Sequence, residues 1–238
     1  MLAAIARAAV PSVLLCLVAA CGSSQISAQL TNEALRASGK GVFVIAVRLV
    51  STTMSTSCDA VRLTRAGDGR DVDVMLSSHL LPEPAAVSGS VELDPGTYAV
   101  TLAMCSRPNV KFVVKPADER GMATISIGPG EVVDGGTLII IEIFQAQFTQ
   151  YFGKSQFSAI VTPDSGGASA SLNRELAGRL IKRPMTAIDP PPLDVLARMC
   201  EYHREQARSR VLSTGTEESP LCQLIRPRTG EAGTRRQR

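Results

Sequence analysis

The chain has 238 residues and a formal net charge of +3, with six Phe, three Tyr and no Trp, so any hydrophobic core must consist mostly of Val, Ile and Leu. The charge is uneven: residues 41–163 hold 9 basic and 12 acidic side chains (net −3), and residues 164–238 hold 13 basic and 9 acidic ones (net +4). The arginine-rich end, residues 226–238, has no interleaved aromatic residues, which argues against binding of nucleic acid.

Residues 1–20 have the pattern of a secretory signal. Arg7 precedes an apolar run over residues 8–20. That run is shorter than the roughly 20 residues that a transmembrane helix needs, and it fits the apolar segment of a signal peptide. The sequence VAAC at residues 18–21 resembles the lipobox of bacterial lipoproteins. The resemblance implies cleavage before Cys21 and its acylation, with palmitate among the chains; two or more chains anchor a protein stably.

The residue after Cys21 is Gly22 and not Asp, which in Gram-negative lipoproteins implies sorting to the outer membrane. We therefore expect a protein held by lipid at the periplasmic face of the outer membrane. A plain secreted protein with an incidental Cys21 is the alternative. Residues 21–40 are small and polar and are expected to form a flexible tether, with a short helical turn at 32–37 as an open alternative.

Strand patterns dominate residues 41–163. Segments rich in β-branched residues or alternating in polarity are separated by Gly and Pro turns, at spacings of about 8 to 15 residues. This pattern predicts a mainly β chain folded as an antiparallel β-sandwich. The run at 138–144 is interrupted by Glu142 and has the length of a strand, so no later segment is expected to span a membrane. The predicted core includes Phe43, Ile45, Val47, Tyr98, Val100, Leu102, Met104 and Phe112.

Two segments carry a resemblance to known β-sandwiches. VELDPGTYAVTL at residues 91–102 resembles a hairpin of immunoglobulin-like or transthyretin-like modules, and ISIGPGEVVDGGTLII at 125–140 resembles a segment of small β-sandwich lipoproteins of unassigned function. Both imply an immunoglobulin-like or transthyretin-like sandwich, and neither implies an activity, because one fold serves many functions.

Helical periodicity follows residue 163. One helix is predicted within residues 169–183, before Pro184, and a longer one within residues 189–212. The expected organisation is a sandwich with a two-helix C-terminal extension over residues 164–225, followed by a disordered basic tail at 226–238. The basic region suggests contact with anionic lipid or lipopolysaccharide phosphates; a solvated helix surface is the plainer interpretation.

No catalytic or cofactor motif is found. PDSGG at residues 163–167 resembles part of the serine motif of trypsin-like proteases, but His79 and His203 lack that family's histidine context. A loop is therefore expected around Ser165. There is no nucleophile elbow and no phosphate-binding glycine loop. These absences predict a protein that is not an enzyme and takes no cofactor.

No metal site is predicted either. Asp68, Asp71 and Asp73 are close in sequence, but a calcium loop needs six or more oxygens in a fixed series and Arg70 lies among them. A hairpin turn explains them better. The two isolated histidines cannot form a zinc site without cysteine thiolates, which have another expected use.

Disulfides are expected among the cysteines that follow Cys21. Cys16 leaves with the signal, and an even number remains beyond the inner membrane: Cys58, Cys105, Cys200 and Cys222. Four cysteines allow three pairings, which sequence alone does not settle. The domain division favours Cys58 with Cys105 and Cys200 with Cys222, and four free buried thiols are the alternative. Strand alternation predicts that the first pair lies off the core face.

Three functional hypotheses follow. The first is a non-catalytic binding or adaptor module that is tethered to the membrane and presents a sandwich face or edge to another envelope protein. The second is a structural accessory subunit of an envelope or secretion assembly, which docks through its helices. The third is a hydrolase of a kind that its motifs do not reveal.

Overall fold

The computed structural model describes residues 30–50, 57–77, 86–116, 119–144, 155–163, 165, 172–209 and 222. The expected signal peptide, Cys21, His79 and the C-terminal tail at 226–238 lie outside these residues. None of the helices in the described part is both long and apolar enough to cross a membrane.

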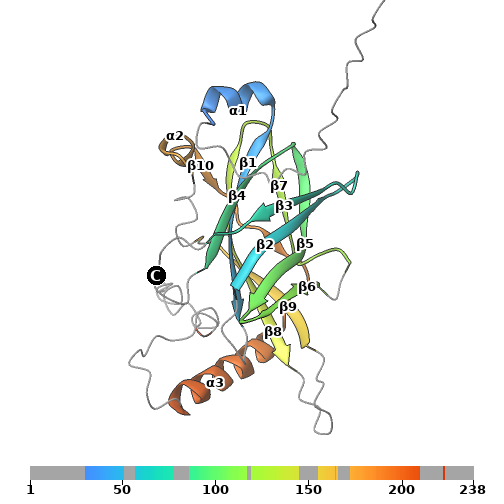
Figure 1. Ribbon diagram of the computed structural model, residues 1–238, viewed down its shortest axis with the longest axis vertical. Coiled ribbons are helices and arrows are strands. Elements are labelled where there is room, and N and C mark those ends of the chain that lie inside the picture. Colours follow the sequence, from blue (N-terminus) through green and yellow to red (C-terminus); the bar gives the residue numbers. More distant parts are fainter. Residues whose placement is uncertain are drawn as a thin grey trace, which may run out of the picture.

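Two sheets pack face to face and form a β-sandwich (Figure 1). Sheet A contains β1 (Gly41–Val50), β4 (Val87–Leu93), β8 (Val132–Phe144), β9 (Ser155–Thr162) and β10 (Leu180–Lys182). Sheet B contains β2 (Ser57–Arg65), β3 (Asp71–Met75), β5 (Gly96–Arg107), β6 (Val110–Val114), β7 (Ala123–Ile127) and β11 (Thr186–Ala187). The predicted mainly β sandwich is confirmed.

Most strand pairs are antiparallel, but β8 pairs in parallel with both β1 and β10. The predicted antiparallel sandwich thus includes parallel pairing at the centre of sheet A. A bulge interrupts the β1–β8 pair, because Gly135 and Gly136 together face the single residue Ile45. Gly136 has a φ of +77°, and a Cβ atom there would lie 2.1 Å from the carbonyl oxygen of Thr162. Glycine is therefore required at this position.

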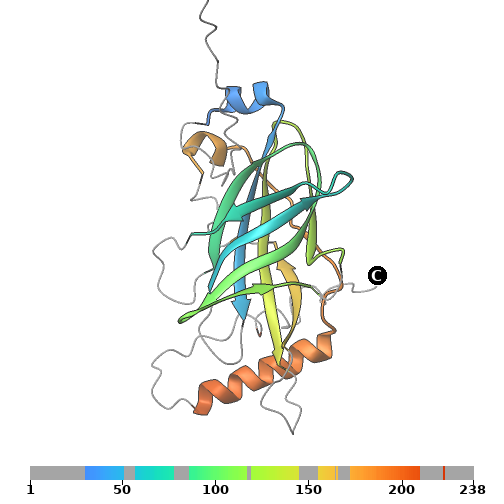
Figure 2. The ribbon, with the colours of Figure 1, turned by 45° about the vertical axis from the view of Figure 1, so that its right-hand side comes forward.

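Three helices cover the outer face of sheet A. α1 (Asn32–Ser38) and α2 (Arg174–Ala177) insert Leu35 and Leu176 over the starts of β1 and β8, and α3 (Leu193–Ser209) packs Leu196 and Met199 over their ends. Figures 1 and 2 show α1 and α2 at one end of the sandwich and α3 at the other. Burial on both faces explains why β1 is a continuous apolar run and not an alternating one.

The region before β1 is a helix in its described part. The structure describes residues 30–40 of the expected tether. Most of them form the helix α1, as the helical alternative predicted, and not a flexible spacer. The side chain of Thr31 accepts a hydrogen bond from the Ala34 N–H at the start of α1, and Gly39 ends the helix with a φ of +66°. These two caps define the helix, and burial of Leu35 secures it to the sheet.

The C-terminal region differs from the expected pair of appended helices. Two helices do follow residue 163, but α2 is a single turn, and the residues predicted to continue it form β10, which pairs with β8. β11 then pairs with β7 in sheet B. Part of the expected extension therefore completes both sheets, because Leu180 packs into the apolar layer beside Val132.

The core lies between the sheets and is made of aliphatic side chains around Phe43 and Tyr98. Five predicted core residues are confirmed as buried there: Phe43, Ile45, Val47, Tyr98 and Val100. Phe112 packs against the core while partly buried. Leu102 and Met104 were predicted wrongly, since a bulge in β5 between Val100 and Leu102 reverses the alternation and brings Ala103 and Cys105 inward instead.

Candidate functional site

The expected lipidation site at Cys21 lies outside the described residues. The first described residue is Leu30, which packs with the apolar layer under α1. The chain therefore enters the described fold at the end that carries α1 and α2.

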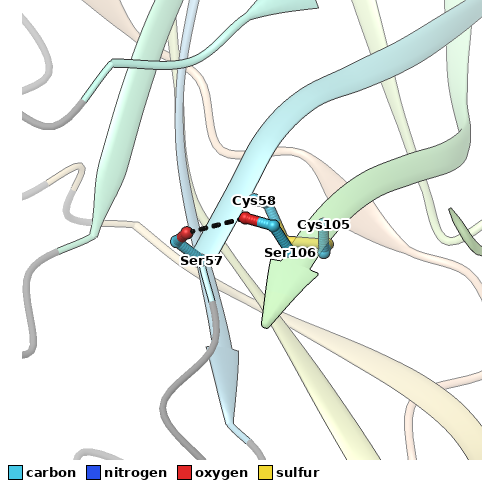
Figure 3. Close-up of a disulfide and its surroundings, with 4 residues drawn as sticks. All are labelled: Ser57, Cys58, Cys105 and Ser106. Atoms are coloured by element: carbon cyan, nitrogen blue, oxygen red, sulfur yellow. Dashed lines mark hydrogen bonds between the residues drawn. A yellow bond between two sulfur atoms is a disulfide. The ribbon is translucent and has the colours of Figure 1, made fainter. Parts of the chain in front are cut away.

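A disulfide joins β2 to β5, between Cys58 and Cys105, which are directly opposite in the antiparallel pair (Figure 3). Beside it the hydroxyls of Ser57 and Ser106 lie 3.3 Å apart, within hydrogen-bond distance (Figure 3). The pairing is the one that the domain division favoured. The predicted orientation is wrong, because both cysteines are at most 3% exposed and belong to the core between the sheets.

Two bulges account for that error. In β2 the extra residue is Asp59, which lies between the pairs Cys58–Cys105 and Ala60–Met104. In β5 the extra residue is Thr101, which lies between the pairs that Leu102 and Val100 form with β2. Each bulge shifts the inward and outward alternation by one position, so the parity counted from Arg62 or Tyr98 fails at the cysteines. The disulfide thus lies inside the sandwich, at the end of the strands far from α1.

The second disulfide joins Cys200 of α3 to Cys222, as the domain division favoured. Cys200 is 2% exposed, on the same helix as the buried Leu196 and Met199. The disulfide attaches Cys222, 22 positions further along the chain, to α3, which covers the ends of β1 and β8 in sheet A.

Ser165 of the PDSGG segment is 6% exposed, and its hydroxyl donates a hydrogen bond of 2.8 Å to Oδ2 of Asp134. The other oxygen of this carboxylate, Oδ1, accepts from the Gly136 N–H at 2.9 Å. Asp134 is also buried, so the two contacts satisfy both of its oxygens at the bulge of β8. The geometry gives Ser165 a structural hydrogen bond; the catalytic partner considered from sequence, His79, lies outside the described residues.

The three carboxylates considered for calcium lie on a hairpin, as the turn interpretation predicted. Asp73 accepts two hydrogen bonds from Arg62, at 2.8 and 3.0 Å, and Asp71 accepts one from Thr64. The contact with Asp73 raises the pKa of Arg62. Asp68 pairs with Arg65. In the part of the chain that the structure describes, no group of three His, Cys, Asp or Glu side chains could hold a metal ion.

A buried ion pair at the disulfide end was not foreseen. Nη2 of Arg107 in β5 lies 2.5 Å from Oε2 of Glu142 in β8, and the Glu142 side chain is only 4% exposed. The Arg107 guanidinium also lies 4.9 Å from the centre of the Phe112 ring. The sequence offered one signal for this ion pair, the interruption of an apolar strand by Glu142. A buried carboxylate requires a cationic or hydrogen-bonding partner, so a partner such as Arg107 could have been expected.

The opposite end is joined by a polar network. Arg179 donates to the side chain of Asn32 and to the carbonyl of Gly130, and the Asn32 N–H donates to Glu175. Arg183 makes two hydrogen bonds with Glu131, at 2.8 and 2.9 Å. These contacts hold α1, α2 and the β7–β8 turn together, and the Arg183 hydrogen bonds lower the pKa of Glu131.

Four further basic residues surround this network: Arg36, Lys40, Arg174 and Lys182, which we call the basic pole. All four are exposed, and none makes an ion pair with another residue of the described ranges. The Cγ atom of Arg36 lies close to Gly130, and the Lys40 carbonyl accepts a hydrogen bond from the Gly130 N–H, so α1 and the β7–β8 turn are in direct contact.

The outer face of sheet B, by contrast, has no helix over it within the described residues. A row of side chains crosses it from β3 to β6: Met75, Met104 and Val113 lie beside one another through the paired register, Met75 and Met104 flanking Ala60. Met75 is 38% exposed and Val113 is 51% exposed. We call these three residues the apolar row.

No protein-family model matches the chain, and no curated protein matches it either. Among solved structures, part of the chain is similar to a leucine-rich repeat protein from Bacteroides thetaiotaomicron, with 12% identity and a TM-score of 0.31. The similarity covers 47% of this chain and 14% of the other. At this score it carries no argument about fold or function.

Proposed function

We propose that the chain is a lipid-anchored protein of the bacterial cell envelope and acts as a non-catalytic binding or adaptor module. In this proposal Cys21 carries the lipid at the periplasmic face of the outer membrane. The observation that carries the binding role is the apolar row on the outer face of sheet B, over which no helix lies within the described residues. Helices bury the equivalent face of sheet A, whereas Met75 and Val113 remain in contact with solvent.

The proposed partner of the apolar row is another envelope protein. Methionine side chains are flexible and polarisable, so they adapt to different protein surfaces. The charged side chains beside the row, Arg62 and Asp73, already satisfy each other. The row therefore offers apolar contact bordered by polar and charged side chains, and protein-binding patches commonly have an apolar centre with a polar rim.

The anchor is tested by labelling with palmitate in a bacterial host that processes lipoproteins. The wild-type chain should incorporate the label and lose its first 20 residues, whereas a Cys21→Ala variant should do neither. Cys16→Ala is the matched control and should label like the wild type. Equal labelling of the Cys21→Ala variant would contradict the anchor.

The binding role is tested with a photo-reactive amino acid placed at single positions of the lipidated protein in intact envelopes. Val113 on the apolar row should give a discrete cross-linked product, and the exposed Ala197 on α3 should not. A product only at Ala197 would instead favour the second candidate, a structural accessory subunit that docks through its helices. A hydrolytic activity that is lost on Ser165→Ala, with folding intact, would contradict both.

A further inference from the structure

The end of the molecule that carries α1 and α2 differs in charge from the rest of the fold. Its three segments, residues 31–40, 128–131 and 172–183, hold six basic and three acidic side chains, a net charge of +3. The remaining described residues hold 11 basic and 13 acidic side chains, a net charge of −2. The folded part therefore has a positive end and a slightly negative body.

The basic pole supplies this excess in a form that is free to bind anions. Arg179 and Arg183 are already occupied by Gly130, Asn32 and Glu131. The four residues of the basic pole are exposed and have no carboxylate partner within the described residues. They come from α1, the turn after it, α2 and β10, and the network around Gly130 and the apolar layer around Leu35 and Leu176 hold these segments side by side.

The position of the proposed anchor limits which surfaces of the fold can meet a membrane. Leu30 follows Cys21 by nine positions, and a chain of nine residues spans at most about 32 Å however it is arranged. β8 has 13 residues and runs from the α2 end to the α3 end, a length of roughly 43 Å. A tether shorter than the long axis of the fold keeps α3 and the disulfide end away from the bilayer, and the α1 end is the part of the described fold nearest to the anchor.

We propose that the basic pole is the surface through which this protein rests on the anionic phospholipid headgroups of its own membrane. The orientation rests on the proposed lipid anchor, whereas the affinity of the pole for phosphate-bearing headgroups rests on its charge alone. Basic side chains near an anionic bilayer each contribute about fivefold in binding, and the attraction acts within a Debye length of about 10 Å. In this orientation the outer face of sheet B points sideways from the membrane normal, so the apolar row stays accessible to a partner.

The test uses the chain from residue 21 onward with Cys21→Ser, which carries no lipid and keeps all the described elements. Its binding to vesicles of phosphatidylcholine, with and without phosphatidylglycerol, is measured by co-sedimentation. We expect binding only to the vesicles with phosphatidylglycerol, weakening as salt is added. Neutralising the pole with Arg36→Ser, Lys40→Ser, Arg174→Ser and Lys182→Ser should reduce the partition coefficient by on the order of 100-fold or more.

The matched control replaces the five arginines of the C-terminal tail with serine: Arg226, Arg228, Arg235, Arg236 and Arg238. It removes one charge more than the pole variant and should retain most of the binding. The proposal is overturned if the tail variant loses binding while the pole variant keeps it, or if phosphatidylglycerol makes no difference. An unchanged near-ultraviolet circular dichroism spectrum shows that each variant is folded.

The two proposals fail separately. Absent palmitate labelling would remove the anchor and leave vesicle binding by the basic pole intact. Absent vesicle binding would remove the pole as a lipid-binding surface and leave the labelling result at Cys21 unchanged.

Discussion

The two sheets of the sandwich are stabilised by different means. Sheet A is buried on both faces, with the core on one side and the apolar layers under α1, α2 and α3 on the other. Within the described residues, sheet B is covered on its core face only, and it carries a disulfide between two of its strands. The comparison shows how one fold combines a sheet covered by helices with a sheet whose outer face carries exposed side chains in the described part of the chain.

Hydrogen-bonding side chains follow the same division. The outer face of sheet B carries paired polar groups, such as Arg62 with Asp73 and Thr64 with Thr101. The outer face of sheet A has apolar Val42, Val44 and Ala46 in the equivalent central strand. Surface pairs of this kind contribute little to stability.

The largest expected effect comes from the disulfide of sheet B. Replacing Cys58 and Cys105 together by alanine should lower the free energy of unfolding by about 4 kcal/mol, because the bond closes a 47-residue separation. Replacing Cys200 and Cys222, which are 22 residues apart, should cost about 3 kcal/mol. Urea unfolding of both variants measures the difference. A smaller loss for the first pair than for the second would contradict the central role of the buried disulfide.

The cover of sheet A comes next. Leu176→Ala removes a fully buried side chain between α2 and the sheet and should cost about 3 kcal/mol. Val113→Ala on the open face of sheet B is the control and should change the free energy of unfolding by about 0.5 kcal/mol or less, since Val113 is already exposed. Equal losses in urea unfolding would show that the two outer faces do not differ as described.

The smallest effect concerns pH at the α1 end. Arg183 holds the pKa of Glu131 below its ordinary value of 4.5, so the ion pair stabilises the fold at neutral pH. That contribution is lost as the pH falls through the lowered pKa, because the folded protein must then take up a proton. Both side chains are partly exposed, so Arg183→Gln should cost about 1 kcal/mol or less at pH 7.

The pH dependence separates this ion pair from the other contacts of Arg183. The difference between the wild type and Arg183→Gln at pH 7 should shrink in urea unfolding at a pH below the lowered pKa of Glu131, because that carboxyl is then protonated in both proteins. Arg36→Gln is the control, since Arg36 has no ion pair in the described part, and its effect should not vary with pH. A difference that stays constant between the two pH values would exclude the Glu131 contribution.

Much of the fold was predictable from local pattern. Strand periodicity and turn residues are local properties, so they predicted the sandwich and the hairpin at Asp68 to Asp73. The helical period likewise predicted α3, because its apolar positions recur along one face. The division of the chain into a strand-rich and a helical part also ranked the cysteine pairs correctly.

Tertiary structure decided what depends on partners distant in sequence. The two bulges that turn Cys58 and Cys105 inward arise from the pairing of β2 with β5, and no local pattern marks them. Residues 180–182 became a strand because β8 offered an unpaired edge there, and Glu142 is buried because Arg107 from another sheet reaches it. The basic pole exists for the same reason: its four residues lie in segments more than 130 positions apart, which only folding brings to one end of the molecule.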